Sequence, residues 1–220
     1  IGIGLFLCVR LPKQELSKQT PSILADMGVG TRYAYSHKSI RKTLTIYGLF
    51  VFFTVPAGYL SGLLVSRVYG DTYWYLTAVE LVGFGGMMLG GLLMSVWGGF
   101  KSRRLTLAIA LLLFGAMAIG MGVSSFFYLY LVLMGLYGIA LTAAQTTITT
   151  MLQEETESTM QGRVFGLMSS LYSSCYPIGM LLFGPMADKF PLQWIMIGSG
   201  IVLIILALIA YSEPKSEIEQ

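Results

Sequence analysis

The sequence predicts an all-α integral membrane protein with six membrane-spanning helices. Of its 220 residues, 55% are hydrophobic and only 11% are charged, and the charged residues gather in short connections between long apolar stretches. Each apolar stretch is about as long as the roughly 20 residues that a helix needs to cross a bilayer. A transmembrane β-barrel would instead alternate polar and apolar residues over much shorter segments.

The six spans follow from the spacing of the charges. Only Glu80 interrupts the second apolar stretch. The uncharged stretch 105–153 is long enough for two helices joined by a tight hairpin near residues 124–125. The expected spans are residues 43–66, 74–97, 105–123, 126–149, 161–187 and 192–211, which together form a bundle over residues 43–211.

The distribution of Lys and Arg predicts the orientation of the bundle. If the helices cross alternately, the connections on one side hold all but two of the 14 basic residues, the exceptions being Arg67 and Lys189. Lys and Arg are retained on the cytoplasmic side during insertion, so we expect both ends of the six-helix unit there. The net charge of +3 then reflects topology, and we expect no nucleic acid as a partner.

Three segments lie outside the bundle. Residues 1–9 are apolar, too short to span and without an initiating Met, so we interpret them as the end of a preceding transmembrane helix in a longer protein. Residues 10–42 hold half of the basic residues and are expected to form a cytoplasmic linker. Ser22 can cap a surface helix that begins at Ile23, the alternative being a solvated linker. Residues 212–220 are expected to be a cytoplasmic tail.

The sequence carries no signature of an enzyme, a cofactor or a metal site. It has no Gly-rich Lys-Ser/Thr loop for nucleotides and no convincing pair of nucleophile and base. His37 is the only histidine, and one histidine makes no metal site. Cys8 and Cys175 both lie in apolar segments and do not suggest a disulfide.

An internal similarity predicts two inverted repeats of three helices. Residues 86–95 (GMMLGGLLMS) echo residues 179–188 (GMLLFGPMAD), which aligns Gly91 with Gly184 and Ser95 with Asp188. Because three helices separate the copies, they run in opposite directions through the membrane. Inverted repeats of this kind are common in secondary transporters. The alternative is chance similarity between two stretches rich in Gly, Leu and Met.

Two motifs resemble the major facilitator superfamily of transporters. The first resembles its Gly-x-x-x-Asp-x-x-Gly-x-basic loop, in the copy between helices eight and nine, and consists of Gly91, Ser95, Gly98, Lys101, Arg103 and Arg104. The second, QGRVFGL at residues 161–167 followed by Pro177-x-Gly and Gly184-Pro-x-x-Asp, looks like helix eleven of the drug-efflux branch that includes macrolide exporters. Ser95 stands where the family has an acid, which weakens or removes the charge relay of that loop.

The resemblance implies the C-terminal half of that fold, helices seven to twelve, in a bacterial plasma membrane. The partner it implies is the missing N-terminal six-helix half, besides the lipid bilayer, protons and a small amphipathic substrate. The third and sixth spans, rich in Leu, Ile, Ala and Gly, are expected to face lipid, and the other four to line a cavity.

Glu80 is the sharpest candidate for a functional site. It lies roughly 9 Å inside the outer interface at 1.5 Å per helical residue, where an ionised carboxylate must be paired, hydrated or protonated. It is therefore a candidate for proton coupling or for binding a cationic drug. The alternatives are that it snorkels outward or is paired structurally.

Further candidates lie in the spans and in the basic loop. Polar residues at helical spacing mark candidate cavity residues, with core packing and interhelical hydrogen bonds as the alternative: Tyr137, Gln145, Thr146, Tyr172 and Tyr176. Prolines followed two residues later by glycine mark hinge candidates, or else fixed kinks: Pro56, Gly58, Pro177 and Gly179. The cations of the loop either anchor the topology or grip helix ends in one of two conformations.

These observations together predict a secondary active transporter, a proton-coupled exporter of amphipathic drugs such as macrolides. The membrane architecture follows from the residues, whereas the export direction and the drug class follow from the resemblance. Two alternatives stay open: an exporter of a siderophore or other metabolite, and a non-transporting membrane scaffold module.

Overall fold

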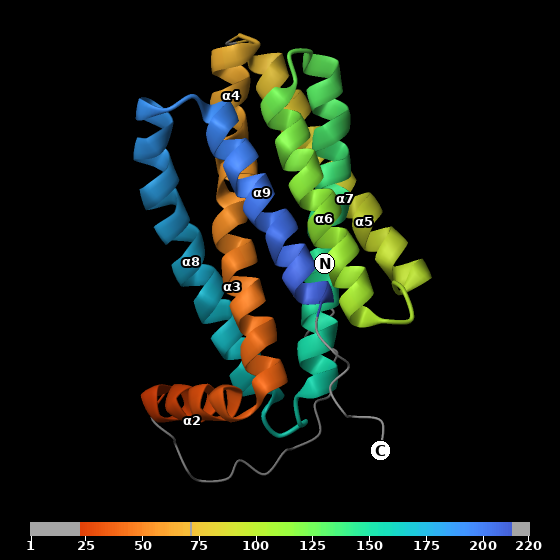
Figure 1. Cartoon of the computed structure of the whole chain (residues 1–220), viewed down its shortest axis with the longest axis vertical. Helices are drawn as coiled ribbons and strands as arrows, with labels where there is room; N and C mark the ends of the chain where they lie inside the picture. Colours follow the sequence, from red (N-terminus) through yellow and green to blue (C-terminus); the bar gives the residue numbers. More distant parts are fainter. Residues whose placement is uncertain (1–22, 71, 213–220) are drawn as a thin grey trace, which may run out of the picture.

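The computed structural model describes residues 23–70 and 72–212, and every regular element in this part of the chain is an α-helix (Figure 1). The helices are α2 (Ile23–Ser36), α3 (Lys38–Tyr59), α4 (Ser61–Val68), α5 (Tyr73–Trp97), α6 (Arg103–Val123), α7 (Phe127–Glu155), α8 (Gln161–Lys189) and α9 (Leu192–Tyr211). The expected helix end at residues 1–9 lies outside the described residues, as do Ser22 and most of the expected tail.

The expected spans correspond to the long helices. Five segments are long and apolar enough to cross a membrane by length and composition: α3 with α4, then α5, α6, α7 and α9. The sixth expected span is α8, which has 29 residues but is too polar to qualify on composition. It packs against α3 and runs beside it along the bundle (Figure 1).

The connections divide between two ends of the bundle. We call the end with residues 98–102 and 156–160 the basic end, and the end with residues 69–70, 124–126 and 190–191 the opposite end. Helix α2 lies crosswise at the basic end and packs on α8 and α3 (Figure 1). Gly30 allows this crossing, because a Cβ there would lie 3.1 Å from the Cβ of Arg163 at the start of α8.

The helix pairs follow the predicted inverted repeat. In the repeat, α3 corresponds to α7, α5 to α8 and α6 to α9. The observed α5–α7 pair therefore corresponds to the observed α3–α8 pair. The aligned glycines Gly86 and Gly179 occupy equivalent crossings. A Cβ on Gly86 would overlap the Gly135 carbonyl of α7, and a Cβ on Gly179 would lie 2.7 Å from Val55 of α3. Such close approach through glycine is the usual way of packing helices in membranes.

The α6–α9 crossing lies where the two repeats meet. A Cβ on Gly115 would lie 2.7 Å from the Gly200 carbonyl oxygen, and a Cβ on Gly200 would lie 2.7 Å from the Gly115 carbonyl oxygen. The contacts with isoleucine are reciprocal too, because a Cβ on Gly115 would contact Ile204 and a Cβ on Gly200 would contact Ile119. Ile204 lies four residues after Gly200, and Ile119 lies four residues after Gly115. The crossing therefore has the two-fold symmetry that an inverted repeat requires, a relation that the sequence comparison had not included.

Helix α5 also presents an exposed apolar face, besides α6 and α9, which are the helices expected to face lipid. Helix α5 is the least buried of the candidate spans. It exposes a stripe of large apolar side chains at helical spacing, Leu81, Phe84, Met88, Leu92 and Val96. Either lipid or another part of the protein must cover this stripe, because apolar surface of this size is unfavourable in water.

Candidate functional site

A polar contact joins α3 and α7 within the bundle. The side-chain amide of Gln145 donates a hydrogen bond to the Tyr47 hydroxyl at 3.3 Å. Tyr47 is only 2% exposed, whereas Gln145 is half-buried. The amide therefore lies between a buried hydroxyl and more open space, where its remaining donor and acceptor groups can reach a ligand.

Two tyrosines of α8 lie next to this contact. The rings of Tyr172 and Tyr176 stack one turn apart with centroids 5.6 Å apart and planes 13° apart, and Tyr172 is 49% exposed. Tyr172 is also within electrostatic range of the Tyr47 hydroxyl. We call Tyr47, Gln145, Tyr172 and Tyr176 the tyrosine cluster. It offers a flat aromatic surface beside hydrogen-bonding groups, a combination suited to an amphipathic ligand.

Glu80 lies within electrostatic range of this cluster. Its carboxylate and the Tyr59 hydroxyl of α3 are both within that range of the Tyr176 hydroxyl. Glu80 is exposed, and the described residues include no hydrogen-bond or ion-pair partner for it. The alternative that Glu80 is paired structurally therefore finds no partner in this part of the chain.

Tyr137 does not join the cluster, and the prediction that it lines a cavity is wrong for this conformation. It is 3% exposed, its ring centroid lies 4.2 Å from that of Phe114, and its hydroxyl points at the Thr54 carbonyl oxygen at 3.5 Å. Thr142, further along α7, donates to the carbonyl oxygens of Met87 and Gly138. Thr146, also predicted as a cavity residue, is half-buried.

The basic loop is held together by Arg103. Gly98 ends α5 in the left-handed conformation with φ of +69°, which favours glycine. The Arg103 guanidinium donates to the Gly98 carbonyl oxygen at 2.7 Å and to the Glu154 carboxylate at 3.0 Å. Ser95 instead bonds within its own helix, to Leu92. The carboxylate that contacts the loop arginine therefore comes from the end of α7 and not from position 95.

The other residues of this loop motif differ in their surroundings. Lys101 is exposed. Arg104 is half-buried and lies within electrostatic range of Lys42 on α3. Gly91 faces α7, where a Cβ would meet the Thr142 methyl group at 4.0 Å, an ordinary contact distance.

The hinge candidates fall into two groups. Helix α3 contains Pro56 and Gly58 and ends at Tyr59, so the first span is interrupted before α4 begins. Helix α8 continues without interruption through Pro177, and Gly179 is packed tightly against α3. Proline removes one backbone hydrogen bond from either helix, but only the first span changes to a new helix there.

Sequence reasoning missed an ion pair at the opposite end. The Arg67 guanidinium donates to the Ala187 carbonyl oxygen at 2.6 Å and to the Asp188 carboxylate at 3.1 Å, which ties α4 to the end of α8. The signal was present, because Arg67 is one of two basic residues that break the charge pattern and Asp188 aligns with Ser95. Only the structure brings residues 121 positions apart together.

Comparison with known proteins agrees with this architecture. Macrolide efflux protein A of Streptococcus pyogenes is 25% identical over 205 residues, covering 91% of this chain and 51% of the relative. Its counterpart of the same name in Enterococcus faecalis is 25% identical over 178 residues, covering 79% and 55%. Multidrug efflux pump Tap of Mycolicibacterium fortuitum is 26% identical over 213 residues, covering 91% and 49%.

The chain spans about half the length of the curated relatives it matches. The family model for the Major Facilitator Superfamily matches residues 69–220. The α5–α7 pair, the symmetric α6–α9 crossing and the Gly98–Arg103 loop all lie within that match. On these grounds the chain belongs to the Major Facilitator Superfamily.

Proposed function

We propose that this chain forms one half of a secondary active exporter, which moves amphipathic drug-like molecules across a bacterial plasma membrane in exchange for protons. The observation that carries the proposal is the tyrosine cluster with Glu80 beside it, in a chain whose relatives are named as efflux proteins. The other half of the transporter completes the pathway around this cluster. The distribution of basic residues favours a cytoplasmic location for the basic end.

The cluster supplies two kinds of contact to such a substrate. The stacked rings of Tyr172 and Tyr176 present apolar surface, and Gln145 presents the hydrogen-bonding groups that its bond to Tyr47 leaves over. Glu80 is the proton or cation site. Because the described residues include no ionic partner for Glu80, its carboxylate is available to a bound cation or to water.

Alternating access needs contacts that exist in one state only. The Arg103–Glu154 pair joins the start of α6 to the end of α7 at the basic end, and Arg67–Asp188 joins α4 to α8 at the opposite end. Both pairs are partly exposed, so each is weak enough to break during a cycle. The interruption after Pro56 is the place where the first span bends as the two halves rock.

The test is efflux of a macrolide and of a fluorescent cationic dye from cells that carry the full-length protein. We expect efflux to stop when a protonophore is added. Glu80→Gln should abolish uphill efflux while ligand binding and downhill exchange stay measurable. Glu157→Gln, which removes an exposed acid from the α7–α8 connection, serves as the control.

Uphill efflux that survives Glu80→Gln would remove Glu80 from the coupling mechanism. Efflux of none of the test compounds, from cells in which the protein reaches the membrane, would reject the drug-exporter proposal. Protonophore-resistant efflux would reject proton coupling alone.

A further inference from the structure

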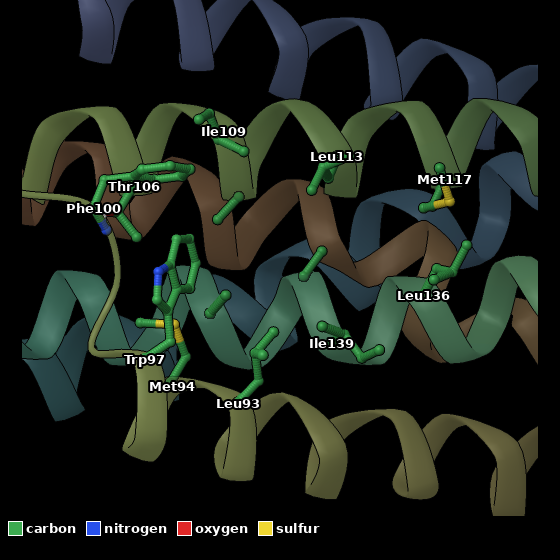
Figure 2. Close-up of a pocket in the computed structure, with 13 residues that line it drawn as sticks. Leu93, Met94, Trp97, Phe100, Thr106, Ile109, Leu113, Met117, Leu136 and Ile139 are labelled. Carbon is green, nitrogen blue, oxygen red and sulfur yellow. Dashed lines mark hydrogen bonds between the residues drawn. The ribbon is translucent and has the colours of Figure 1, made fainter.

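A crevice between α5, α6 and α7 lies outside the candidate site. It extends to the basic end, where Trp97 and Phe100 line it, and has a volume of about 150 Å³. Figure 2 shows Trp97 and Phe100 at the end next to the α5–α6 connection, with Met117 and Leu136 at the far end. The large side chains on its rim are 38–48% exposed, so the crevice is open to the surroundings of the bundle.

The crevice faces away from the tyrosine cluster. Leu136 lines it and Gln145 belongs to the cluster, and these residues are nine positions apart on α7. Nine residues are about two and a half helical turns, which places the two side chains on opposite faces. The helices around the crevice are all candidate membrane spans, so lipid is its natural surroundings.

The wall offers nothing to a polar ligand. Thr106 is the one lining residue with a hydroxyl group, and this hydroxyl is used within the connection. It accepts a hydrogen bond from the Phe100 backbone N–H at 2.9 Å and donates to the Ser102 carbonyl oxygen at 3.2 Å. The surface that remains is entirely apolar. A comparable apolar cavity in a soluble protein excludes water and accepts hydrocarbon.

The length of the crevice matches one leaflet of a bilayer. From Thr106 to Met117 it follows α6 for eleven residues, roughly 16 Å at 1.5 Å per residue. The hydrocarbon core of a bilayer is about 30 Å thick, so one leaflet contributes roughly 15 Å. An acyl chain that starts at the interface near Phe100 would therefore end near Met117.

Cationic side chains lie at the interfacial end of the crevice. Lys101 directly follows the lining residue Phe100 and is exposed, and Arg103 lies one residue beyond Ser102. We infer that the crevice binds an acyl chain of an anionic phospholipid from the leaflet on the side of the basic end, with the lipid phosphate next to Lys101. Trp97 on the rim sits where an aromatic ring meets both chain and headgroup. The inference does not depend on what the protein exports.

Trp97 provides the probe. All other tryptophans of the full-length protein, including Trp74 and Trp194, are changed to Phe, and the protein is placed in nanodiscs of phosphatidylcholine. Phosphatidylglycerol with brominated acyl chains then replaces part of the lipid. We expect half-maximal quenching of Trp97 at a several-fold lower fraction of brominated lipid than for a variant that keeps only Trp74, at the opposite end.

Two pairs of variants separate the chain from the headgroup. Ala143→Leu fills the crevice and should raise the half-quenching fraction to the Trp74 value, whereas Gly198→Leu, on open space of α9, should not. Lys101→Gln should remove the preference for phosphatidylglycerol over brominated phosphatidylcholine, whereas Lys189→Gln, at the opposite end, should leave it unchanged.

Three results would overturn the inference. If quenching of Trp97 rises in proportion to the fraction of brominated lipid in the nanodisc and Ala143→Leu does not change it, no acyl chain is bound in the crevice. Equal effects of Lys101→Gln and Lys189→Gln on the lipid preference would show that Lys101 does not contact the headgroup. Relief of quenching by a macrolide but not by unlabelled phosphatidylglycerol would assign the crevice to the exported substrate.

Discussion

Gly86→Ala tests whether the α5–α7 crossing depends on backbone contact. A Cβ at position 86 would overlap the carbonyl oxygen of Gly135 and come within 3.1 Å of its Cα, and Gly135 has no side chain that could move aside. This overlap can be relieved only if α5 and α7 move apart. A gap of 0.5–1 Å forfeits about a quarter to a half of the dispersion energy at each contact, and overpacking by one methyl group typically costs about 1–3 kcal/mol.

Gly85→Ala is the matched control one residue earlier on the same helix. A Cβ at position 85 has nothing within 4 Å, so the substitution adds only helix propensity, at most about 1 kcal/mol in favour of the folded state. We expect Gly86→Ala to lower the free energy of unfolding by about 2 kcal/mol or more, and Gly85→Ala to leave it unchanged or raise it slightly.

Reversible unfolding of the purified protein in mixed micelles measures the difference. If the two alanine variants unfold with the same free energy, α5 and α7 are not in backbone contact at Gly86 and the packing described here is wrong. A loss in both variants would point to a requirement for flexible glycine in α5 rather than for close approach.

Three further predictions concern the polar contacts. A double-mutant cycle of Arg103→Gln and Glu154→Gln should give a coupling of about 0–1 kcal/mol in the free energy of unfolding, because both side chains are partly exposed; a coupling above about 3 kcal/mol would contradict this. Tyr47→Phe removes the acceptor of the Gln145 amide and should cost about 1 kcal/mol in the same assay, whereas no change would show that water replaces the bond. Burial raises the pKa of Tyr69 at the end of α4 in the folded protein. The contribution of Tyr69 to the free energy of unfolding is therefore fully present below the unfolded pKa near 10, and it is lost as pH rises through the higher folded pKa. Tyr69→Phe should therefore reduce the loss of stability above about pH 10, and the variant at exposed Tyr73 should not; identical alkaline profiles would refute the effect of burial.

Local sequence patterns were sufficient to predict the membrane spans and the inverted repeat. Charges are excluded from the hydrocarbon core whatever the tertiary contacts, so gaps between charges place most span ends within two residues. The exceptions are α3, which begins at Lys38 and not at residue 43, and α7, which ends at Glu155 and not at residue 149. The first span alone departs from one continuous helix, because it is interrupted between α3 and α4. The internal similarity that predicted the repeat also aligns Gly86 with Gly179, and the structure places both at close helix crossings, where small residues are favoured.

The side-chain roles depended on which face of each helix meets a neighbour. Tyr137 and Gln145 belong to the same helix, yet Tyr137 packs in the core and Gln145 reaches the tyrosine cluster. Hydropathy cannot distinguish them, because both a core and a cavity accept an aromatic or amide group. The open crevice at α5, α6 and α7 likewise arises from the shapes of three helices together.

The sequence by itself determined that this protein crosses a membrane, where its spans lie, and that its two three-helix repeats run in opposite directions. Those properties follow from the cost of placing charge in hydrocarbon and from the periodicity of the chain. Only the tertiary structure decided that Glu154 supplies the acid for Arg103, that Arg67 meets Asp188, and that Glu80 lies near Tyr176. Those contacts join residues far apart in the chain, and they are set by the packing of helices rather than by any local pattern.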